Sequence, residues 1–455
     1  MRTVFVNPAQ GDLVEHKGRI YNRTWTPLDL AYCAAVVREA GGGDVSIIDA
    51  NAERLTPADV AARVRGADRA FVTSTSLDRW QCPHLDLAPF VGVVEAVRRV
   101  TPDVFVLGSH GTVKPAEILE LTGATAVVRG EPERTVAAIA QAGSLTDVNG
   151  ISLIENGAVV HRPSQTPVRM DDLPLPALDL LPMERYRYEV LGDRFSLFEM
   201  SRGCASACTF CLLETYGVGV RKKSVDTLAR EIEWAVAQFG LRTAYFIDLE
   251  FTVLRKQVLE LCRYLVKADL DLTWCCQTRL DLVDAELLSW MKRAGCRLIH
   301  TGVEAGSDRM LELVDKGITL EQIRTGMALI REAGIETACF FMIGFPESTK
   351  ADMDDIVRLA VELEPTYPLF HITAPYPGTK LYEQVRADDT LRFSDESLFP
   401  EAIEARFRVD ELKAMTRRAY LRYYTRPRYV ARRLMRGDLG ALFGQLRLFS
   451  SYIRA

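Results

Sequence analysis

Three cysteines in one short segment have a spacing that can hold an inorganic cluster. Cys204, Cys208 and Cys211 form a CxxxCxxC pattern within the run Ser201-Arg-Gly-Cys-Ala-Ser-Ala-Cys-Thr-Phe-Cys211. The β-favouring run 195–200 precedes them, so we expect a loop at the end of a strand. Iron–sulfur clusters are held by cysteine thiolates, and a cubane needs four ligands. Three thiols without a fourth nearby would leave one iron open to a small molecule.

Two other interpretations of these cysteines are weaker. A structural zinc site usually has four ligands in paired CxxC-like steps, and this segment offers neither a fourth cysteine nor a histidine. Buried cysteines can also act as small hydrophobic residues. That role suits the cysteines that lie in apolar patterns, Cys33, Cys262, Cys275, Cys276, Cys296 and Cys339. The preceding strand, together with the spacing, favours the cluster.

The motif, with aromatic Phe210 just before its third cysteine, resembles the signature of the radical SAM superfamily. The resemblance implies a [4Fe–4S] cluster on Cys204, Cys208 and Cys211, which would be both metal-binding and catalytic residues. It also implies that S-adenosylmethionine (SAM) occupies the open iron through its amino and carboxylate groups. An electron from the cluster would then break the sulfonium bond and give a 5′-deoxyadenosyl radical.

The whole chain has the size and composition of a globular protein with two or three domains. Its 455 residues carry a net charge of −5, which gives no general preference for nucleic acid. The sequence contains neither a signal-peptide pattern nor a run that approaches the length of a membrane span. Ten cysteines without a secretory signal indicate reduced thiols in the cytoplasm.

Residues 1–142 alternate strand and helix patterns and predict an α/β domain. The expected strands are 3–6, 45–48, 70–73, 104–107 and 124–128. The expected helices are 28–40, one that opens at Thr56-Pro57, 88–100 and 115–121. This order predicts a five-stranded, doubly wound parallel sheet, a Rossmann-like fold whose ligands bind beyond the carboxyl ends of the strands. Short polar or glycine-rich loops follow four of these strands, at 7–8, 73–76, 108–111 and 129–132.

The order and spacing of these loops resemble the cobalamin-binding domain of B12-dependent radical SAM enzymes, with Val128-Arg-Gly-Glu131 as the most recognisable piece. The Asp-x-His-x-x-Gly motif of methionine-synthase-type domains is absent, so the resemblance implies cobalamin without a protein histidine on cobalt. We hypothesise that Trp80 shields the lower face of cobalt. Alternatively, Trp80 is an aromatic residue packed in the protein interior. His110 is expected at the corrin edge, and its alternative is a solvated loop histidine. The expected cobalamin-binding residues are Asn7, Ser74, Ser76, Trp80, Gly108, Ser109, His110, Gly130 and Glu131.

Residues 143–194 are expected to form a linker, with a hairpin around Asn156-Gly157 and then a proline-rich passage. Residues 195–385 resume the alternation, with helix-capping signals at Ser224 and at Thr319 with Gln322. Six βα units are too few to close an eight-fold barrel and match the partial (β/α)6 barrel of the radical SAM fold. The six expected strands are 195–200, 244–248, 272–276, 298–303, 337–342 and 369–373.

Reactive groups of parallel barrels lie at the carboxyl ends of the strands, and these ends carry polar or glycine-rich sequence here. By resemblance, Asp248 and Glu250 would lie near the SAM amino group, and Ile343-Gly-Phe-Pro346 would pack along the adenine. Glu304 and Arg279 are preferred over Glu250, whose role Asp248 could take. The expected SAM-binding residues are Phe210, Asp248, Glu250, Arg279, Glu304, Gly344 and Pro346.

Residues 386–455 are expected to be a small, mainly helical subdomain. The segment from Arg417 to Ala455 is rich in arginine and aromatic residues. We predict that this subdomain caps the barrel mouth and has a solvated basic face. Association with a membrane surface is the alternative.

Together the resemblances imply a cobalamin-dependent radical SAM methyltransferase, and we expect it to be a cytoplasmic monomer. It would move a methyl group from SAM through methylcobalamin to an unactivated carbon, or phosphorus, of a small-molecule or natural-product intermediate. A flavodoxin- or ferredoxin-type partner would supply electrons, and nucleic acid is not expected as a partner. Oxidative cyclisation or ring contraction without methyl transfer stays open.

Two further classes are disfavoured. A methylthiotransferase that acts on tRNA or a ribosomal protein would carry three more cluster-binding cysteines in its N-terminal domain, where only Cys33 and Cys82 occur. A corrinoid carrier or sensor without catalysis would not need three intact cluster cysteines. The cysteine pattern therefore indicates an enzyme, although no motif identifies its substrate.

Overall fold

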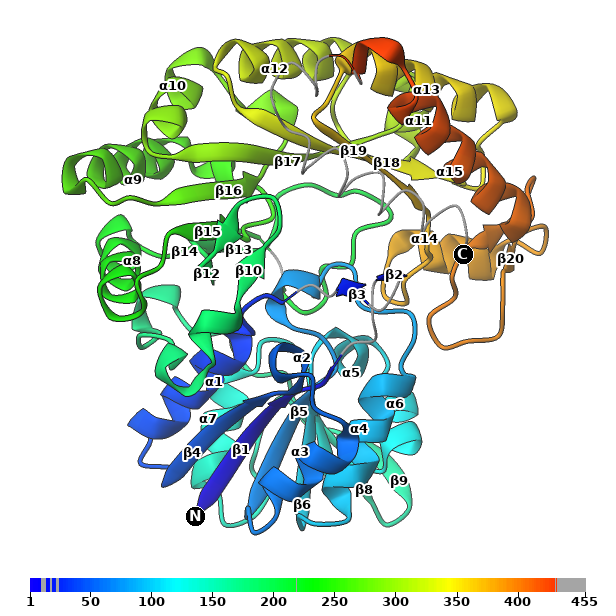
Figure 1. The fold of residues 1–455 in the computed structure, drawn as a ribbon. Coiled ribbons are helices and arrows are strands. Elements are labelled where there is room, and N and C mark those ends of the chain that lie inside the picture. Colours follow the sequence, from blue (N-terminus) through cyan, green and yellow to red (C-terminus); the bar gives the residue numbers. More distant parts are fainter. Residues whose placement is uncertain (10–13, 17–18, 22–23, 218, 430, 432–455) are drawn as a thin grey trace.

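The computed structural model describes residues 1–9, 14–16, 19–21, 24–217, 219–429 and 431. They form two α/β parts, the N-terminal one below the C-terminal one in Figure 1, joined by the segment 143–194. No helix within these ranges is long and apolar enough to cross a membrane. Most of the predicted basic tail, residues 432–455, lies outside the described residues.

The N-terminal part is built on one twisted sheet. Its strand order is β4 (Asp44–Asp49), β1 (Arg2–Asn7), β5 (Arg69–Thr73), β6 (Asp103–Leu107), β7 (Ala126–Val128), β8 (Ile151–Glu155) and β9 (Ala158–His161). The first five strands are parallel, which confirms the predicted doubly wound sheet. The chain order reverses between β1 and β5, where doubly wound sheets bind their ligands.

The predicted linker hairpin extends this sheet. Strand β8 pairs antiparallel with β7, and β9 pairs with β8. The two turn residues, Asn156 and Gly157, have φ values of 50° and 79°, as a tight hairpin turn between twisted strands requires. The sheet therefore has two strands more than the five expected, because the hairpin covers the edge that β7 would otherwise expose.

Helices cover both faces of the sheet. Helices α1 (Leu28–Glu39) and α7 (Glu133–Gln141) lie on one face, and α3 (Pro57–Val64), α4 (Ala88–Arg98) and α6 (Pro115–Thr122) lie on the other. Two short helices, α2 (Ala50–Glu53) and α5 (Ser109–Val113), follow strand ends. Under α1, the rings of Phe5, Phe71 and Phe105 stack in register, with centroids 5.0 and 4.9 Å apart. This apolar layer continues into the core of the C-terminal part, whereas the opposite face of the sheet has a core of its own under α3, α4 and α6.

The C-terminal part is an open parallel sheet in sequential order. Its strands are β12 (Phe195–Phe198), β15 (Thr243–Phe246), β16 (Thr273–Gln277), β17 (Cys296–Glu304), β18 (Glu336–Ile343) and β19 (Tyr367–Ile372). All five neighbouring pairs are parallel, which confirms the predicted six-stranded partial barrel. Its helices are α8 (Val225–Phe239), α9 (Arg255–Ala268), α10 (Ala285–Arg293), α11 (Asp308–Leu313), α12 (Leu320–Glu332) and α13 (Lys350–Leu363). Figure 1 shows them on the outside, with the opposite face of the sheet turned toward the N-terminal part.

Local signals set these elements. Ser224 caps α8 by accepting a hydrogen bond from the Thr227 amide, and Gly240 ends it in the left-handed region. Thr319 and Gln322 form the predicted capping box of α12. Minor strand pairs complete the fold: β2 (Val14–His16) with β3 (Arg19–Tyr21), β10 (Arg187–Tyr188) with β11 (Gly192–Asp193), β13 (Ser201–Arg202) with β14 (Arg221–Lys222), and β20 (Arg392–Phe393) with β21 (Ile403–Glu404).

The C-terminal region differs from the predicted cap. After α14 (Lys380–Ala387) come turns and the β20–β21 pair, and then the long helix α15 (Val409–Tyr424). Helix α15 lies along the outer side of β19 and α13, where Tyr420 packs edge-on against Phe370. Its buried residues recur at helical spacing, so that face must meet apolar strands. The segment before α15 reaches the N-terminal part instead, through Phe399.

Candidate functional site

The three cysteines lie on a loop with a narrow neck. Strands β13 and β14 pair antiparallel at the neck and enclose residues 203–220, which we call the cluster loop. Gly203 has a φ of +92°, and a Cβ atom there would collide with the Gly219 carbonyl, so glycine is required. The Thr209 amide donates to the Val314 carbonyl, and the Leu381 amide donates to Thr209. The loop is thus fixed to the C-terminal part at Thr209, through both the amide and the carbonyl of that residue.

The thiols differ in environment. A hydrogen bond with Cys211 lowers the pKa of Cys208 to about 7, while burial, aided by the Glu250 charge, raises the pKa of Cys204 to about 11. The Ser206 amide donates to the Cys204 sulfur at 3.3 Å. In the described part of the chain, no three His, Cys, Asp or Glu side chains surround a point where a single ion could bind. A cubane takes its cysteines on separate irons, so this donor set fits an iron–sulfur cluster.

Two of the residues predicted to bind SAM lie directly beside this loop. Ser206 donates to Glu250 at 2.7 Å and accepts from Arg279 at 3.1 Å. Arg279 also forms a two-point pair with Asp281, with both distances 2.9 Å, and donates to the Lys316 carbonyl at 2.6 Å. Glu250 and Arg279 therefore form a polar cluster next to Cys204, at the carboxyl ends of β15 and β16.

Glu304 belongs to a buried ion pair that the sequence did not reveal. Lys316 donates to Glu304 at 2.9 Å, and both side chains are at least 90% buried. Burial opposes the ammonium charge, but Glu304, Cys208 and Cys211 outweigh it and raise the pKa of Lys316. Glu304 has a φ of 64° at an irregularity of β17, a strained conformation that the ion pair helps to hold. Lys316 thus sets a positive charge beside the thiols.

The other residues predicted to bind SAM differ in how close they lie to the cluster loop and in what they contact. Asp248 is buried and accepts from the Met200 amide (3.0 Å) and the Ser201 hydroxyl (2.6 Å), so it ties β15 to β13. Burial raises the pKa of Asp248 to about 6. Phe210 packs on Phe345, with ring centroids 5.5 Å apart, which brings the cluster loop to the segment that contains Gly344 and Pro346. Asp248 is therefore committed to structural contacts, whereas Glu250 faces the loop.

Several residues predicted to bind cobalamin make internal hydrogen bonds. The Asn7 amide donates to Asp49 at 2.9 Å, and the Ser74 hydroxyl donates to the Leu107 carbonyl at 2.9 Å. Ser76 donates to Asp78 at 2.6 Å, and Ser109 donates to the Trp80 carbonyl at 2.8 Å. These contacts fix the loops that follow β1, β5 and β6, at the edge where the strand order reverses. Two further residues of the predicted set also make internal contacts. The Gly130 amide donates to the Thr112 hydroxyl, and Glu131 accepts from Arg202 and Arg221 at the neck of the cluster loop.

Two buried polar atoms at this edge lack a partner among the described residues. They are Nδ1 of His110 and Nε1 of Trp80. His110 makes a 2.7 Å hydrogen bond through Nε2 to the His84 carbonyl, and burial lowers its pKa to about 4. The neutral ring therefore offers Nδ1 as an acceptor. Gly108 lies so close to Ser74 and Thr75 that a Cβ would come within 2.7 Å of both. Unpaired polar atoms in a segment where glycine leaves room for a close approach fit a ligand that carries amide groups, and cobalamin is such a ligand.

Comparison with known proteins accounts for both parts. The radical SAM superfamily model matches residues 198–360, and the B12 binding domain model matches residues 21–140. The chain is 30% identical over 446 residues to the uncharacterized methyltransferase PH0819 of Pyrococcus horikoshii, covering 94% of this chain and 93% of the relative. This chain belongs to the cobalamin-dependent radical SAM enzymes. The cofactors that its two domains imply are a [4Fe–4S] cluster, SAM and cobalamin.

A second relative and one solved structure are also similar to this cobalamin-dependent radical SAM enzyme. It is 28% identical over 400 residues to the anaerobic magnesium-protoporphyrin IX monomethyl ester cyclase of Rubrivivax gelatinosus, covering 85% of this chain and 70% of the relative. It also resembles the structure of the radical SAM methyltransferase TsrM from Kitasatospora setae, with cobalamin and a [4Fe–4S] cluster bound, at a TM-score of 0.69 and 19% identity. That match covers 86% of this chain and 77% of TsrM and shows a common fold.

A row of rings crosses the inner face of the enzyme's barrel. Successive ring centroids are 5.1, 5.8 and 5.8 Å apart, from Tyr245 to His300, Phe340 and His371. Neighbouring residues of a strand point to opposite faces, and Phe370, next to His371, packs against α15. The row therefore faces the N-terminal domain. Phe340 is half-buried and His371 is exposed.

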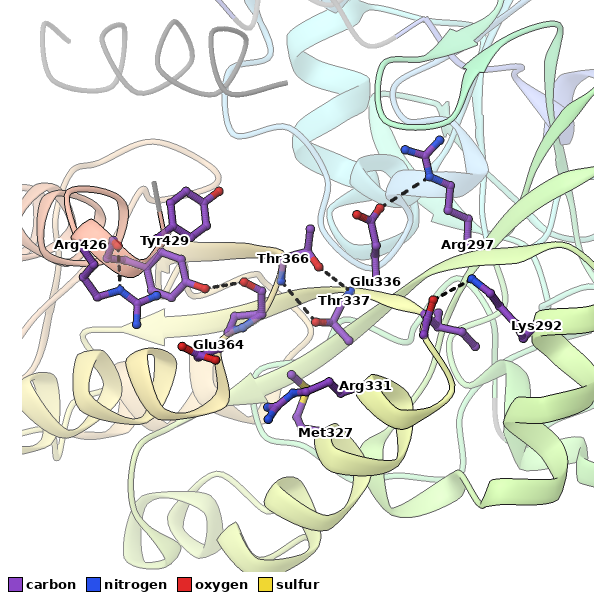
Figure 2. A pocket seen from close by; sticks show the side chains of 14 residues that line it. Lys292, Arg297, Met327, Arg331, Glu336, Thr337, Glu364, Thr366, Arg426 and Tyr429 are labelled. Atoms are coloured by element: carbon purple, nitrogen blue, oxygen red, sulfur yellow. Dashed lines mark hydrogen bonds and ion pairs between the residues drawn. The ribbon is translucent and has the colours of Figure 1, made fainter. Parts of the chain in front are cut away.

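A cavity of about 530 Å³ lies at the opposite end of the barrel (Figure 2). Glu336 and Thr337 at the start of β18, and Thr366 just before β19, form part of its wall. Two of its cations hold carbonyl groups, since Lys292 donates to Gly334 and Arg331 donates to Leu363, and Arg297 pairs with Glu336 at 3.6 Å. Chemistry in parallel barrels occurs at the carboxyl ends of the strands. The cluster loop lies at those carboxyl ends, whereas this cavity lies at the opposite end.

The burial of Asp29 is expected to make the stability of the protein depend on pH. It is buried in the first turn of α1, where one oxygen accepts from the Leu77 amide at 3.3 Å and the other has no partner among the described residues. Burial raises the pKa of Asp29 from 3.8 to about 7. The folded protein thus binds this proton more tightly than the unfolded chain does, and the stability contributed by Asp29 falls as the pH rises from about 4 to 7.

Asp29→Asn is expected to stabilise the cofactor-free protein at pH 8 by about 2 kcal/mol. It removes an ionisation cost of about 4 kcal/mol, offset by about 2 kcal/mol for an unpaired buried amide. Urea unfolding at pH 8 and pH 5 measures this, and no gain is expected at pH 5, where the carboxyl is already protonated. Equal gains at the two pH values would contradict the assignment.

Proposed function

We propose that this enzyme transfers a methyl group from SAM, by way of cobalamin, to an unactivated carbon, or phosphorus, of a small-molecule or natural-product intermediate. The main support is the similarity over 94% of the chain to a relative named as a methyltransferase. When bound, the cluster supplies the electron that cleaves SAM, and cobalamin carries the methyl group. An external flavodoxin- or ferredoxin-type donor and a monomeric state belong to the same proposal.

The residues beside the cluster loop have distinct tasks in this proposal. Cys204, Cys208 and Cys211 hold three irons. Glu250 and Glu304 present carboxylates to the SAM amino group. Arg279 donates to Ser206 at 3.1 Å, and Ser206 in turn donates to Glu250 at 2.7 Å, so Arg279 helps to keep both in place. Phe210 and the segment with Gly344 and Pro346 flank the adenine. Asp248 acts indirectly, because both of its oxygens support the strand before the loop.

The substrate is proposed to lie between the barrel and the N-terminal domain. The inner-face rings turn toward that domain, and Phe340 and His371 place an apolar and a polar ring side by side at one end of the row. Glu304 stands four positions beyond His300 on β17, so the same strand connects the ring row with the cluster side. This arrangement supports hydrogen abstraction from a substrate held along the inner face.

Oxidative cyclisation is the second candidate, because the Rubrivivax cyclase matches 85% of the chain. The two reactions consume SAM differently. Methyl transfer uses one SAM as methyl donor and a second as radical source, so each product is accompanied by one S-adenosylhomocysteine and one 5′-deoxyadenosine. Cyclisation would form 5′-deoxyadenosine without S-adenosylhomocysteine.

The deciding experiment is anaerobic turnover with SAM that carries a deuterated methyl group, in the presence of cell extract as the substrate source. Mass spectrometry should find equal amounts of the two nucleoside products and a product that carries the labelled methyl. The Cys204→Ala variant is the control for cluster-independent transfer. 5′-Deoxyadenosine without S-adenosylhomocysteine or labelled product would replace methyl transfer by cyclisation.

His110 and Trp80 are proposed to contact cobalamin. Loss of one hydrogen bond to a corrin amide should weaken binding by about tenfold, so His110→Ala and Trp80→Phe should each raise the dissociation constant for hydroxocobalamin by about that factor. Absorbance titration of the full-length protein measures the change. His161→Ala, which alters a histidine of β9, is the control and should bind as the wild type does. Unchanged affinity and spectrum in both variants would remove these residues from the cobalamin site.

A further inference from the structure

A buried network of charges joins the N-terminal domain to the neck of the cluster loop. Glu131, from the loop after β7, lies between Arg202 on β13 and Arg221 on β14. These arginines are directly opposite each other in the strand pair that closes the neck. We propose that Glu131 is a positioning residue, through which the cobalamin-binding domain holds the cluster loop in place.

The contacts of Glu131 use both of its oxygens. Oε2 accepts from Arg202 Nη1 at 3.0 Å and from Arg221 Nη1 at 3.1 Å, and Oε1 pairs with Arg221 Nη2. The Glu131 side chain is 2% exposed. A carboxylate with two guanidinium partners has little capacity left for another ligand. This geometry assigns Glu131 to the cluster loop and not to direct contact with cobalamin, the role predicted from the sequence.

Arg202 is anchored independently of Glu131. It forms a two-point pair with Glu199, at 2.9 and 2.7 Å, and approaches Glu133 at 2.7 Å. Burial opposes the charge of Arg202, but Glu133, Glu199 and Glu131 together raise its pKa well above the ordinary value. Two carboxylates would therefore still neutralise Arg202 without Glu131. Removing Glu131 should release the β14 side of the neck while the fold is kept.

The network also reaches the proposed cobalamin side. The guanidinium of Arg202 lies 5.7 Å from the ring centre of Trp80, which in turn packs edge-on against Tyr216 of the cluster loop. Arg221 donates to the Tyr216 carbonyl at 2.9 Å. One set of contacts thus connects the loop after β5, the loop after β7 and both ends of the cluster loop. A shift of one domain against the other must displace this neck.

The inference rests on the proposed function only in taking the cluster loop to bind an iron–sulfur cluster. The contacts of Glu131 with Arg202 and Arg221 do not depend on that function. Amide hydrogen exchange of the full-length protein, with and without anaerobic reconstitution of the cluster, tests it. In Glu131→Gln, exchange in peptides that cover 203–220 should become about tenfold faster, with unchanged exchange in α3, α4 and α12. Reconstituted Glu131→Gln should lose its iron faster and show an altered electron paramagnetic resonance spectrum when reduced.

A double-variant cycle identifies the partner. Arg221→Gln should reproduce the faster exchange, and the double variant should be no worse than either single variant, because both changes break the same contact. Glu131→Asp should restore part of the protection. Glu53→Gln, which breaks an ion pair with Arg63 elsewhere in the N-terminal domain (2.7 Å), is the matched control and should leave 203–220 unchanged.

The outcomes separate this inference from the proposed function. Wild-type exchange over 203–220 in Glu131→Gln, or an equal rise in exchange across the N-terminal domain, would overturn the positioning role. Wild-type protein that cannot hold a cluster would refute the proposed function, and the exchange result without cofactors would still decide the role of Glu131.

Discussion

Cys208→Ala should purify as a folded protein without a cluster. Cys208 is the buried member of the three thiols, and its pKa of about 7 makes it the one most readily available as a thiolate near neutral pH. Loss of one of three protein ligands leaves two irons of a cubane without protein anchors. We expect iron and sulfide near zero after anaerobic reconstitution, and loss of 5′-deoxyadenosine formation from SAM.

This loss should be confined to the cluster. Hydroxocobalamin binding and the far-ultraviolet circular dichroism should match the wild type, since the expected cobalamin loops belong to the other domain. Cys82→Ala is the control, because Cys82 is a partly exposed cysteine of the N-terminal domain outside the motif. A Cys208→Ala protein that retains a full complement of iron and sulfide would disprove the ligand assignment.

The sequence was sufficient for the fold because its signals are local. The predicted strands of the N-terminal domain ended within two residues of the observed ones, and the capping residues Ser224 and Thr319 stand where the helices begin. Periodicity and caps depend on residues close in the chain. Two features that depend on distant partners were not predicted. The predicted hairpin at Asn156-Gly157 joined the edge of β7, which gives the sheet seven strands and not five, and α15 packed outside β19. Which surface an amphipathic element covers depends on pairing that periodicity does not encode.

Only the parts of the candidate site that belong to sequence motifs could be predicted. The cysteine spacing identified the loop, and the strand-end positions located Glu250, Arg279 and Glu304 near it. Lys316 was missed because it follows α11 in a turn and approaches the thiols only through the tertiary fold. Arg202 stands two residues before Cys204, which could have drawn attention to it, but its partner Glu131 lies 71 residues earlier in the chain. Ion pairs between domains have no characteristic separation in the sequence, so they cannot be recognised from it.

Lys316→Met is expected to destabilise the protein by about 3–5 kcal/mol, because it leaves the Glu304 carboxylate buried without its partner. Lys316 also helps to lower the pKa of Cys208, after the hydrogen bond from Cys211. Its loss should raise that pKa and slow cluster assembly at pH 7. Urea unfolding measures the stability, and the pH dependence of thiol alkylation in the cofactor-free protein measures the pKa.

Two controls test whether the buried charge is the cause. In Lys316→Met with Glu304→Gln, no uncompensated charge remains, so most of the lost stability should return. The pKa of Cys208 should lie between those of the wild type and of Lys316→Met, because the Glu304 charge that raises it is removed as well. Lys413→Met breaks a half-exposed pair with Glu401 at 3.0 Å and should cost less than about 1 kcal/mol. If the double variant were as unstable as Lys316→Met alone, the lost stability would come from the packing of the lysine stem. The Lys316–Glu304 pair would then stabilise the end of β17 by packing and not by the attraction between the two charges.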